Sequence, residues 1–386
     1  DTIANDGPKD PGGTVTWSTN ASTTDSDSDG SADTVNLVVC KTAGVSAGDC
    51  DGGSGDRWCQ SGATASDPSC TYDVPTPTAD QAYDAYVYLF DSHNFAADTN
   101  QGSSSNYTVN NVAPTVASVT LNSGSAIDLT ENTTTSVTIT GTVTDNNACG
   151  DISSVETSLY RSSVGWTSCD NDAEDNDNSC YAQVSCSVVG AGNTCDGSSD
   201  ASADYTCSIS VQSHADPTDA STVYSADTWL STVKATDDDA STGNDEVSSG
   251  VEMNSLTALD VTSDINYGTL SPGQKNDPLD QTATVTATGN VGLDVELSGT
   301  DMTDNGDTIV VGKQHYALAG STAYDSGTVL SSSATEAELN CAKTTTGGSP
   351  ETAATYWGIE IPADQPAGDY SGSDTFGAVK GETGDW

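Results

Sequence analysis

Residues 25–33 carry the densest set of side chains that could bind a metal ion. Asp25, Asp27 and Asp29 alternate with serines, a glycine follows at the sixth position, and Asp33 stands at the ninth. Alternate residues place carboxylates on one side of a tight turn, and glycine at position six permits the sharp bend of a calcium-binding loop. The spacing therefore predicts a Ca²⁺ site whose ligands are these four aspartates.

The loop departs from the helix–loop–helix calcium motif in two respects. Asn36 occupies the twelfth position, where that motif places a glutamate, and no flanking helices are readable. An isolated acidic loop that resembles those of thrombospondin or dockerin repeats is therefore the better interpretation. The alternative is a solvated Asp/Ser turn in a chain already rich in aspartate.

Two further acidic clusters lack defined ligand spacing. The first crowds a cysteine-rich loop and the second follows an expected strand; their members are Asp170, Asp172, Glu174, Asp175 and Asp177, and Asp237, Asp238, Asp239, Asp245 and Glu246. Like charges this close are costly unless a cation screens or bridges them. Because neither cluster has a ligand pattern, we interpret both as solvated acidic loops.

The eleven cysteines fall into groups of four, six and one along the chain. Even numbers within separate units predict local disulfides, while the lack of a Cys-x-x-Cys pair and the scarcity of histidine argue against zinc. The connectivity stays open, with 3 and 15 possible pairings in the two groups. The cysteines expected to pair are Cys40, Cys50, Cys59, Cys70, Cys149, Cys169, Cys180, Cys186, Cys195 and Cys207.

The third group is a single cysteine, Cys341. In an oxidising compartment such a thiol is either buried as a small apolar residue or used in an intermolecular bond. Leu339 and Ala342 indicate a strand near the core, so we expect a buried thiol.

Three Asn-x-Ser/Thr sequons begin at Asn20, Asn106 and Asn132. On an exported chain each is an acceptor for an N-linked glycan. The motif is short and common, but in a chain so rich in serine and threonine we expect at least one glycan.

The sequence contains no recognisable catalytic pattern. His93, His214 and His315 lie in different parts of the chain, and no His-Glu-x-x-His run, Gly-x-Ser-x-Gly elbow or phosphate-binding loop occurs. Two carboxylates could serve glycoside hydrolysis, but among 57 acidic residues such a pair is uninformative. We therefore expect no enzymatic activity.

The elements that position these groups are expected to be short strands. Apolar residues alternate within residues 35–39, 86–90, 136–143, 282–288 and 293–297, as half-buried strands require. Gly, Thr, Ser and Asp suit strands joined by turns, and few stretches combine helix formers. Low hydrophobicity with high charge is also typical of disorder, but the regular strand spacing favours an all-β chain.

The formal net charge of −48, from 9 basic and 57 acidic residues, limits the partners. A surface of this charge repels nucleic-acid phosphates and anionic lipid headgroups, so we expect neither as a partner. Divalent cations are the expected partners instead. A saline habitat alone could also explain the excess of aspartate over lysine.

Cysteine content and hydropathy predict the location. Disulfides persist outside the reducing cytosol, and no apolar run is long enough to span a bilayer. The sequence starts at Asp1 without a signal peptide, which is consistent with a processed, mature form. We therefore expect an exported, extracellular or cell-surface protein without direct membrane insertion.

We expect three tandem β-sandwich domains at residues 1–112, 113–256 and 257–386. Pro114 marks the first boundary, because proline fixes an extended link and stops a strand ladder. The second boundary, near residues 252–261, lacks proline and glycine, so we expect one strand to pass from domain to domain.

Parts of the second and third units resemble known modules. Residues 113–121 and 232–239 resemble the opening and penultimate strands of immunoglobulin-like or PKD-like modules in tandem surface proteins. Residues 257–386, notably 265–273 and 356–372, are similar to a C-terminal sandwich in exported surface proteins of poorly cultivated archaea and candidate-phylum bacteria. The resemblance implies architecture and location, and it implies no chemistry.

The predicted function is an exported structural subunit of a cell-surface layer, filament or pilus-like fibre that polymerises with copies of itself. Residues 14–18 and 375–380 alternate like strands and could add to an open sheet edge of another copy; the alternative is that both pair within their own domains. Because copies of this charge repel, assembly would need salt or divalent cations.

The second functional class is a monomeric adhesin or carbohydrate-binding surface protein. It would use exposed aromatics, and Trp166, Trp229 and Trp357 could stack on a sugar. A position in a sandwich core is the commoner fate of such a tryptophan. A homopolymer in purified surface material would separate the structural function from this one.

Overall fold

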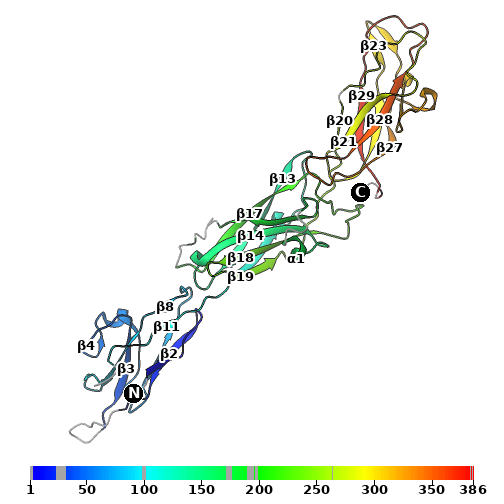
Figure 1. Ribbon diagram of the computed structural model, residues 1–386. Helices are drawn as coiled ribbons and strands as arrows, with labels where there is room; N and C mark the ends of the chain where they lie inside the picture. The colour runs from blue at the N-terminus through cyan, green and yellow to red at the C-terminus, as the bar shows by residue number, and fades with distance from the viewer. Residues whose placement is uncertain are drawn as a thin grey trace.

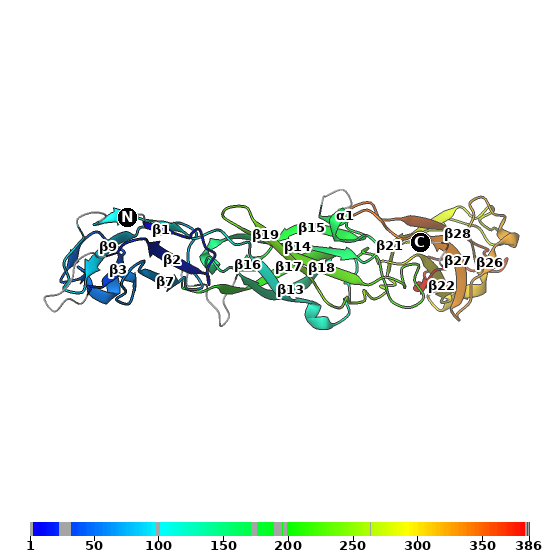
Figure 2. The ribbon, with the colours of Figure 1, turned by 90° about the horizontal axis from the view of Figure 1, so that it is seen from below.

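The chain forms an elongated molecule in which short antiparallel sheets follow one another (Figure 1). We call residues 3–112 the N-terminal region, 113–256 the central region and 257–386 the C-terminal region; they succeed each other along the long axis (Figure 2). The computed structural model describes residues 3–22, 32–97, 101–170, 176–188, 195, 199–262, 264–382, 384 and 386.

The N-terminal region is built from short strands in two main sheets. Its elements are β1 (Ile3–Asn5), β2 (Thr14–Thr19), β3 (Val35–Cys40), β4 (Val45–Ser46), β5 (Asp49–Cys50), η1 (Gly53–Asp56), β6 (Arg57–Gln60), β7 (Ser69–Asp73), β8 (Ala82–Tyr83), β9 (Tyr86–Asp91), β10 (Ser103–Ser104) and β11 (Tyr107–Thr108). The sheets are ordered β1-β2-β7 and β10-β9-β3-β6, with two-stranded pairs β11-β8 and β4-β5. Trp17 of one sheet and Leu37 and Leu89 of the other meet in one hydrophobic cluster.

The central region contains the longest strand pairing. Its elements are β12 (Thr115–Leu121), η2 (Asn122–Gly124), β13 (Thr134–Thr144), η3 (Cys149–Asp151), β14 (Ile152–Arg161), α1 (Trp166–Cys169), β15 (Cys180–Ser185), β16 (Ser187–Val188), β17 (Ser202–Gln212), β18 (Trp229–Asp237) and β19 (Thr242–Glu246). The two sheets are ordered β12-β13-β17-β16 and β15-β14-β18-β19. β13 and β17 pair without interruption over their whole lengths.

The C-terminal region repeats this arrangement with a larger first sheet. Its elements are β20 (Leu259–Val261), β21 (Gln281–Ala287), β22 (Leu293–Gly299), β23 (Met302–Asp304), β24 (Asp307–Ile309), η4 (Val311–Lys313), β25 (Gln314–Ala317), η5 (Tyr324–Ser326), β26 (Thr328–Val329), β27 (Thr335–Cys341), β28 (Thr352–Ile359) and β29 (Asp374–Lys380). The sheets are ordered β20-β21-β28-β25-β26 and β27-β22-β29, with the hairpin β23-β24.

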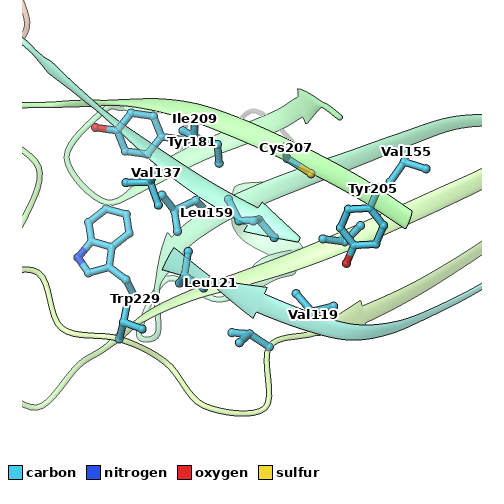
Figure 3. Packing of buried hydrophobic residues seen from close by; sticks show 14 of the residues in the cluster. Val119, Leu121, Val137, Val155, Leu159, Tyr181, Tyr205, Cys207, Ile209 and Trp229 are labelled. Carbon is cyan, nitrogen blue, oxygen red and sulfur yellow. The ribbon is translucent and has the colours of Figure 1, made fainter. Parts of the chain in front are cut away.

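Alternation along the strands explains the central core. On β17 every second residue from Ala203 to Val211 is buried, and on β13 Val137 and Ile139 face the same way. Figure 3 shows Val137 and Ile209 in one cluster with Leu159 and Trp229 of the other sheet. Because Trp229 is fully buried and its Nε1 donates to Asp216 O (2.9 Å), replacing it with alanine would cost about 3–5 kcal/mol of stability.

The fold confirms the predicted all-β class and the strands expected at residues 35–39, 86–90, 136–143, 282–288 and 293–297. The pattern is clearest on β13, where alternate residues face one hydrophobic cluster. β3 and β9 are buried on both faces, because their alternate residues belong to two different clusters. Among the described residues, no helix is both long enough and apolar enough to cross a membrane.

The prediction of one strand through residues 252–261 is wrong. Residues 254–258 lie outside any strand, and β20 begins only at Leu259. The buried Asn290 takes the backbone groups of this segment instead: Leu256 N donates to Asn290 Oδ1 (2.6 Å), and Asn290 Nδ2 donates to Asn254 O (3.1 Å). Gly289 permits this close approach, because a Cβ there would lie 1.9 Å from Leu256 O.

Both segments predicted for strand addition pair within their own chain, as the alternative had it. Residues 14–18 belong to β2, which lies between β1 and β7 and has no open edge, and residues 375–380 belong to β29, which pairs with β22. The edge strands nearest the two termini are β1 and β29, each with one hydrogen-bonded neighbour. The terminal segments are therefore not loose extensions, and any strand addition has to use the outer edges of β1 or β29.

Candidate metal centre

The predicted Ca²⁺ loop is described only in part. Asp25, Asp27 and Asp29 lie outside the described residues, so their role stays a prediction. Asp33 is 4% exposed, and its Oδ1 accepts a hydrogen bond from Ser92 Oγ (2.9 Å).

Asp33 lies in a cluster of three possible metal ligands that the spacing of residues 25–33 did not predict. Its Oδ1 lies 3.4 Å from His93 Nδ1, and ligand atoms of Asp33, Asp91 and His93 all lie within 4.8 Å of one another. Asp91 Oδ1 already accepts from the backbone N–H groups of His93 (2.9 Å) and Phe95 (2.8 Å). Local hydrogen bonds therefore account for much of this arrangement.

A larger acidic group lies between the N-terminal and central regions. One carboxylate oxygen from each of Asp145, Asp151 and Asp237 lies within 4.8 Å of the other two, and the same holds for Asp80, Asp238 and Asp239. Asp80 comes from the N-terminal region, just before β8, and the other five come from the central region. We call these six residues the acidic junction.

The ends of both central sheets position the inner three aspartates. Asp145 directly follows β13 of one sheet, Asp237 is the last residue of β18 of the other, and Asp151 ends η3. Asp145 is 0% exposed and Asp237 is 1% exposed. The two carboxylates are therefore held inside the end of the central region, next to the N-terminal region.

Hydrogen bonds fix these carboxylates but leave oxygens unsatisfied. Asp145 Oδ1 accepts from Asn147 N (2.7 Å), and Asp237 Oδ1 accepts from Ser241 N (2.6 Å). The second oxygens of Asp145 and Asp151 are buried and accept no hydrogen bond. Buried polar atoms without a partner are rare in folded proteins, and one explanation is an ion.

The linker between the two regions is bound to the same group. Val112 N donates to Asn147 Oδ1 (2.7 Å), and Asn147 Nδ2 donates back to Asn110 O (3.0 Å). Asn111 Nδ2 donates to Asp237 Oδ2 (3.0 Å). The acidic junction and the path of the linker are therefore one structure.

The six carboxylates of the acidic junction lie close enough together for their negative charges to repel one another. Burial, contact with Asp238 and the charge of Asp80 raise the pKa of Asp151 to about 7. Burial first, and neighbouring carboxylates second, also raise the pKa values of Asp80 and Asp145. Among the described residues, no lysine, arginine or histidine forms an ion pair with any of the six.

The interpretation of Asp237, Asp238 and Asp239 as a solvated loop is only partly right. Asp238 and Asp239 are exposed, but Asp237 is buried because it closes the end of β18. Glu246, expected in the same cluster, lies on β19 and accepts a hydrogen bond from Tyr160 Oη.

The other predicted acidic cluster is described only at its ends. Asp172, Glu174 and Asp175 lie outside the described residues. Asp170 Oδ1 accepts from Ser158 Oγ (3.2 Å), and Asp170 Oδ2 lies 4.0 Å from Lys234 Nζ. This part of the chain therefore brings together no ligand set that the structure describes.

A basic side chain holds the boundary between the central and C-terminal regions. Lys343, which follows β27, is 3% exposed; its Nζ lies 3.1 Å from Asp216 Oδ1 and donates to His214 O (2.7 Å). Arg161 Nε lies 3.2 Å from Asp216 Oδ2, and Arg161 also pairs with Asp227. Two positive and two negative charges thus form a neutral network, which we call the lysine junction.

Burial shifts the pKa values of Asp216, Lys343 and His214 at this boundary. It raises the pKa of Asp216 and lowers the pKa of Lys343, and in each case the charge of the partner opposes the effect. The pKa of His214 is lowered by burial first and by the charge of Lys343 second. Neutral His214 is therefore the form that fits this boundary.

The predicted local disulfides are confirmed. Each of the ten cysteines pairs within its own region, and the pairs are Cys40–Cys50, Cys59–Cys70, Cys149–Cys195, Cys169–Cys180 and Cys186–Cys207. Five disulfides indicate an oxidising environment outside the cytosol.

Cys341 is the last residue of β27 and is 1% exposed, so the expected buried thiol is confirmed. It packs in the C-terminal cluster beside Leu293 and Leu339. Burial in apolar surroundings keeps a thiol unreactive.

The three predicted glycan acceptors have different surroundings. Asn20 and Asn132 are exposed. Asn106 is exposed too, but its Nδ2 donates to Asp84 Oδ1 (2.8 Å) and its Oδ1 accepts from Ser104 Oγ (2.8 Å). A glycan on Asn106 would have to replace the bond to Asp84.

The histidines and the predicted sugar-stacking tryptophans form no common site. His93, His214 and His315 lie in three different regions. Trp229 and Trp357 are fully buried in the central and C-terminal clusters, and Trp166 packs against the Cys169–Cys180 disulfide. Trp229 and Trp357 are therefore core residues.

The sequence analysis did not single out Asp80, Asp145, Asp151 or Lys343. The aspartates come from distant loops and follow no ligand spacing, so only the fold brings them together. Lys343 did carry a signal: it is one of only nine basic residues and follows Cys341 and Ala342, two small residues expected near the core.

Comparison with known proteins adds no relative. No model of a known protein family matches the chain, and a search of curated proteins finds no match.

Proposed function

We propose that the chain is an exported structural subunit of a cell-surface layer, filament or pilus-like fibre, built from three tandem immunoglobulin-like β-sandwich domains. The observation that carries this proposal is the single-file arrangement in Figure 1, in which each region has its own hydrophobic cluster. Such an arrangement spans length rather than enclosing a substrate cavity. Five disulfides and a charge of −48 suit a rod exposed to an oxidising, cation-containing medium.

We place assembly at the outer edges of the terminal strands. Asp6 N donates to Thr16 O (3.2 Å), so by the alternation of an antiparallel pair Ile3 N–H points away from β2. Gly381 N donates to Gly292 O (2.8 Å), so Ala378 N–H likewise points away from β22. An edge of unpaired backbone groups accepts a strand from another copy.

Electron microscopy of shed surface material and of purified protein in high salt with Ca²⁺ tests this function. We expect repeating rods made of this chain alone. The double variant Ile3→Pro, Ala378→Pro removes two outward N–H groups and should abolish fibres without lowering thermal stability. Ile3→Val with Ala378→Ser is the matched control and should still polymerise; a wild type that stays monomeric would contradict the proposal.

A half-buried aromatic group favours an adhesin as the second candidate. Trp58 packs edge-on against Tyr72 (4.7 Å between ring centres) and Tyr83 (6.0 Å), and Lys41 Nζ lies 4.9 Å from the Trp58 ring. Partly exposed aromatic rings stack on sugars. Trp58→Ala should then abolish binding to a glycan array while leaving polymerisation unchanged.

A further inference from the structure

We propose that the acidic junction binds a divalent cation of the Ca²⁺ class, which links the N-terminal region to the central region. Asp145, Asp151 and Asp237 supply the inner ligands, and Asp80 of the N-terminal region belongs to the adjacent group with Asp238 and Asp239. This inference concerns a different part of the chain from the predicted loop at residues 25–33, and it goes beyond the structural function.

The buried Asp145 carboxylate is the observation that points to a ligand. Asp145 is 0% exposed, and its Oδ2 accepts no hydrogen bond although an oxygen of Asp151 and one of Asp237 lie within 4.8 Å. A solvated acidic loop would place such an oxygen in water. An unpaired, fully buried carboxylate oxygen costs several kcal/mol unless a cation or proton compensates it.

Other buried oxygens near Asp145 also lack a hydrogen-bond donor. Asp151 Oδ2 and Asn111 Oδ1 are also buried oxygens without a donor. Asn111 is the linker residue whose amide donates to Asp237 Oδ2 (3.0 Å). All three unsatisfied atoms are therefore acceptors, which a hydrogen-bond donor or a cation can satisfy and another carbonyl oxygen cannot.

The donor set selects the kind of cation. The six side chains of the junction offer carboxylate oxygens only, with neither cysteine nor histidine among them. Oxygen-only sites suit hard cations, and Ca²⁺ accepts six to eight such ligands in irregular geometry, whereas Mg²⁺ demands a near-ideal octahedron. Ligands drawn from three separate connections between strands favour the more tolerant ion.

Binding would also change the mechanics of the rod. Asp80 comes from the N-terminal region and its charge acts on Asp151, while Asp145, Asp151 and Asp237 belong to the central region. Without a cation, repulsion among the carboxylates acts across the boundary; with one, the same residues attract a common centre. The cation would therefore convert a weak boundary into a stiff one.

Calorimetric titration of the chelator-stripped full chain with CaCl₂ in high salt tests the site. Asp145→Asn keeps the bond from Asn147 but removes the charge, and we expect it to weaken one class of site by at least about tenfold, the cost of disturbing even the surroundings of a metal ligand. Asp307→Asn, an exposed residue on β24, makes the same charge change elsewhere and should bind as the wild type does.

Three outcomes would overturn the proposal. They are unchanged binding in Asp145→Asn, an equal loss in Asp307→Asn, and equal binding of MgCl₂ and CaCl₂, because the last two indicate only diffuse screening. If Asp145→Asn fails to fold, the exposed Asp238→Asn replaces it with the same expectation. Asp27→Asn should remove a different class of site, so loss of the loop site and loss of this one are distinguishable.

Discussion

The two boundaries between regions differ in how the negative charge of their buried carboxylates is compensated. At the lysine junction, Lys343 and Arg161 neutralise Asp216 and Asp227 inside the chain. At the acidic junction, six aspartates meet without a basic partner among the described residues. One boundary is therefore complete as folded, and the other depends on its surroundings.

This difference indicates which boundary between regions can change its stiffness with the surrounding medium. With only nine basic residues in 386, the chain places a buried lysine at one boundary and leaves the other to cations from the medium. Salt screens buried ion pairs much less than exposed ones, whereas the occupancy of a cation site depends on the cation concentration in the medium. We expect the N-terminal boundary to loosen first when divalent cations are removed.

The largest loss of stability should come from removing the buried positive charge of Lys343. Lys343→Ala leaves Asp216 buried with Arg161 alone, and breaking one side of a buried pair costs about 3–5 kcal/mol. Chemical denaturation should show this loss in the free energy of unfolding of the central and C-terminal regions. Lys275→Ala, which removes an exposed pair with Asp325, is the control and should unfold as the wild type does; equal stability of the two variants would contradict a locking role for Lys343.

Removing a disulfide should have a smaller effect on stability, and its effect on Ca²⁺ binding should differ between the two ends of the central region. Cys149 belongs to η3 together with Asp151, and the Cys149–Cys195 disulfide closes a separation of 46 residues. Cys149→Ala with Cys195→Ala should lower stability by about 2–4 kcal/mol and also weaken Ca²⁺ binding, because η3 carries a ligand.

The Cys169–Cys180 disulfide is the matched comparison at the other end. Replacing both cysteines with alanine should lower stability without changing Ca²⁺ affinity. If calorimetry shows the same loss of affinity in both double variants, general destabilisation and not the position of Asp151 is the cause.

Sequence alone could predict most strands but not the side chains that meet at the two boundaries. Strands such as β13 and β17 bury alternate residues against one core, so their pattern is local. The lone Asp145 and the mid-loop Asn290 act only on segments that the fold brings to them, and no local spacing marks them. The calcium-loop spacing at residues 25–33 could be predicted, because its four expected ligands follow one another within nine residues of sequence.

The lysine junction should weaken on mild acidification. Because the pKa of His214 is lowered in the fold by burial and by Lys343, with Asp177 acting in the opposite direction, the unfolded chain binds more protons just below its ordinary pKa. Stability is therefore fully present above about pH 6.5 and is lost as the pH falls through the lowered value. Because Asp151 also titrates in this range, the test is the difference in the free energy of unfolding between the wild type and His214→Gln, followed with pH. We expect the wild type to lose stability relative to His214→Gln as the pH falls, and a difference that does not change with pH would contradict this origin.

The smallest effect should come from the C-terminal strand. Lys380 Nζ donates to Ser255 Oγ (2.9 Å), a bond between β29 and the boundary segment. Lys380→Met keeps the aliphatic length and should cost about 1 kcal/mol, the net value of one hydrogen bond. A loss as large as that of Lys343→Ala would mean that β29 and not Lys343 carries the boundary.

Hydrogen exchange on the full-length chain, with and without Ca²⁺, tests the central claim most directly because both boundaries are read in one sample. We expect Ca²⁺ to slow exchange in peptides covering residues 78–82, 108–116 and 144–152, and to leave residues 252–262 and 341–345 unchanged. Equal slowing at both boundaries, or none at the first, would contradict a cation-dependent acidic junction beside a self-sufficient lysine junction.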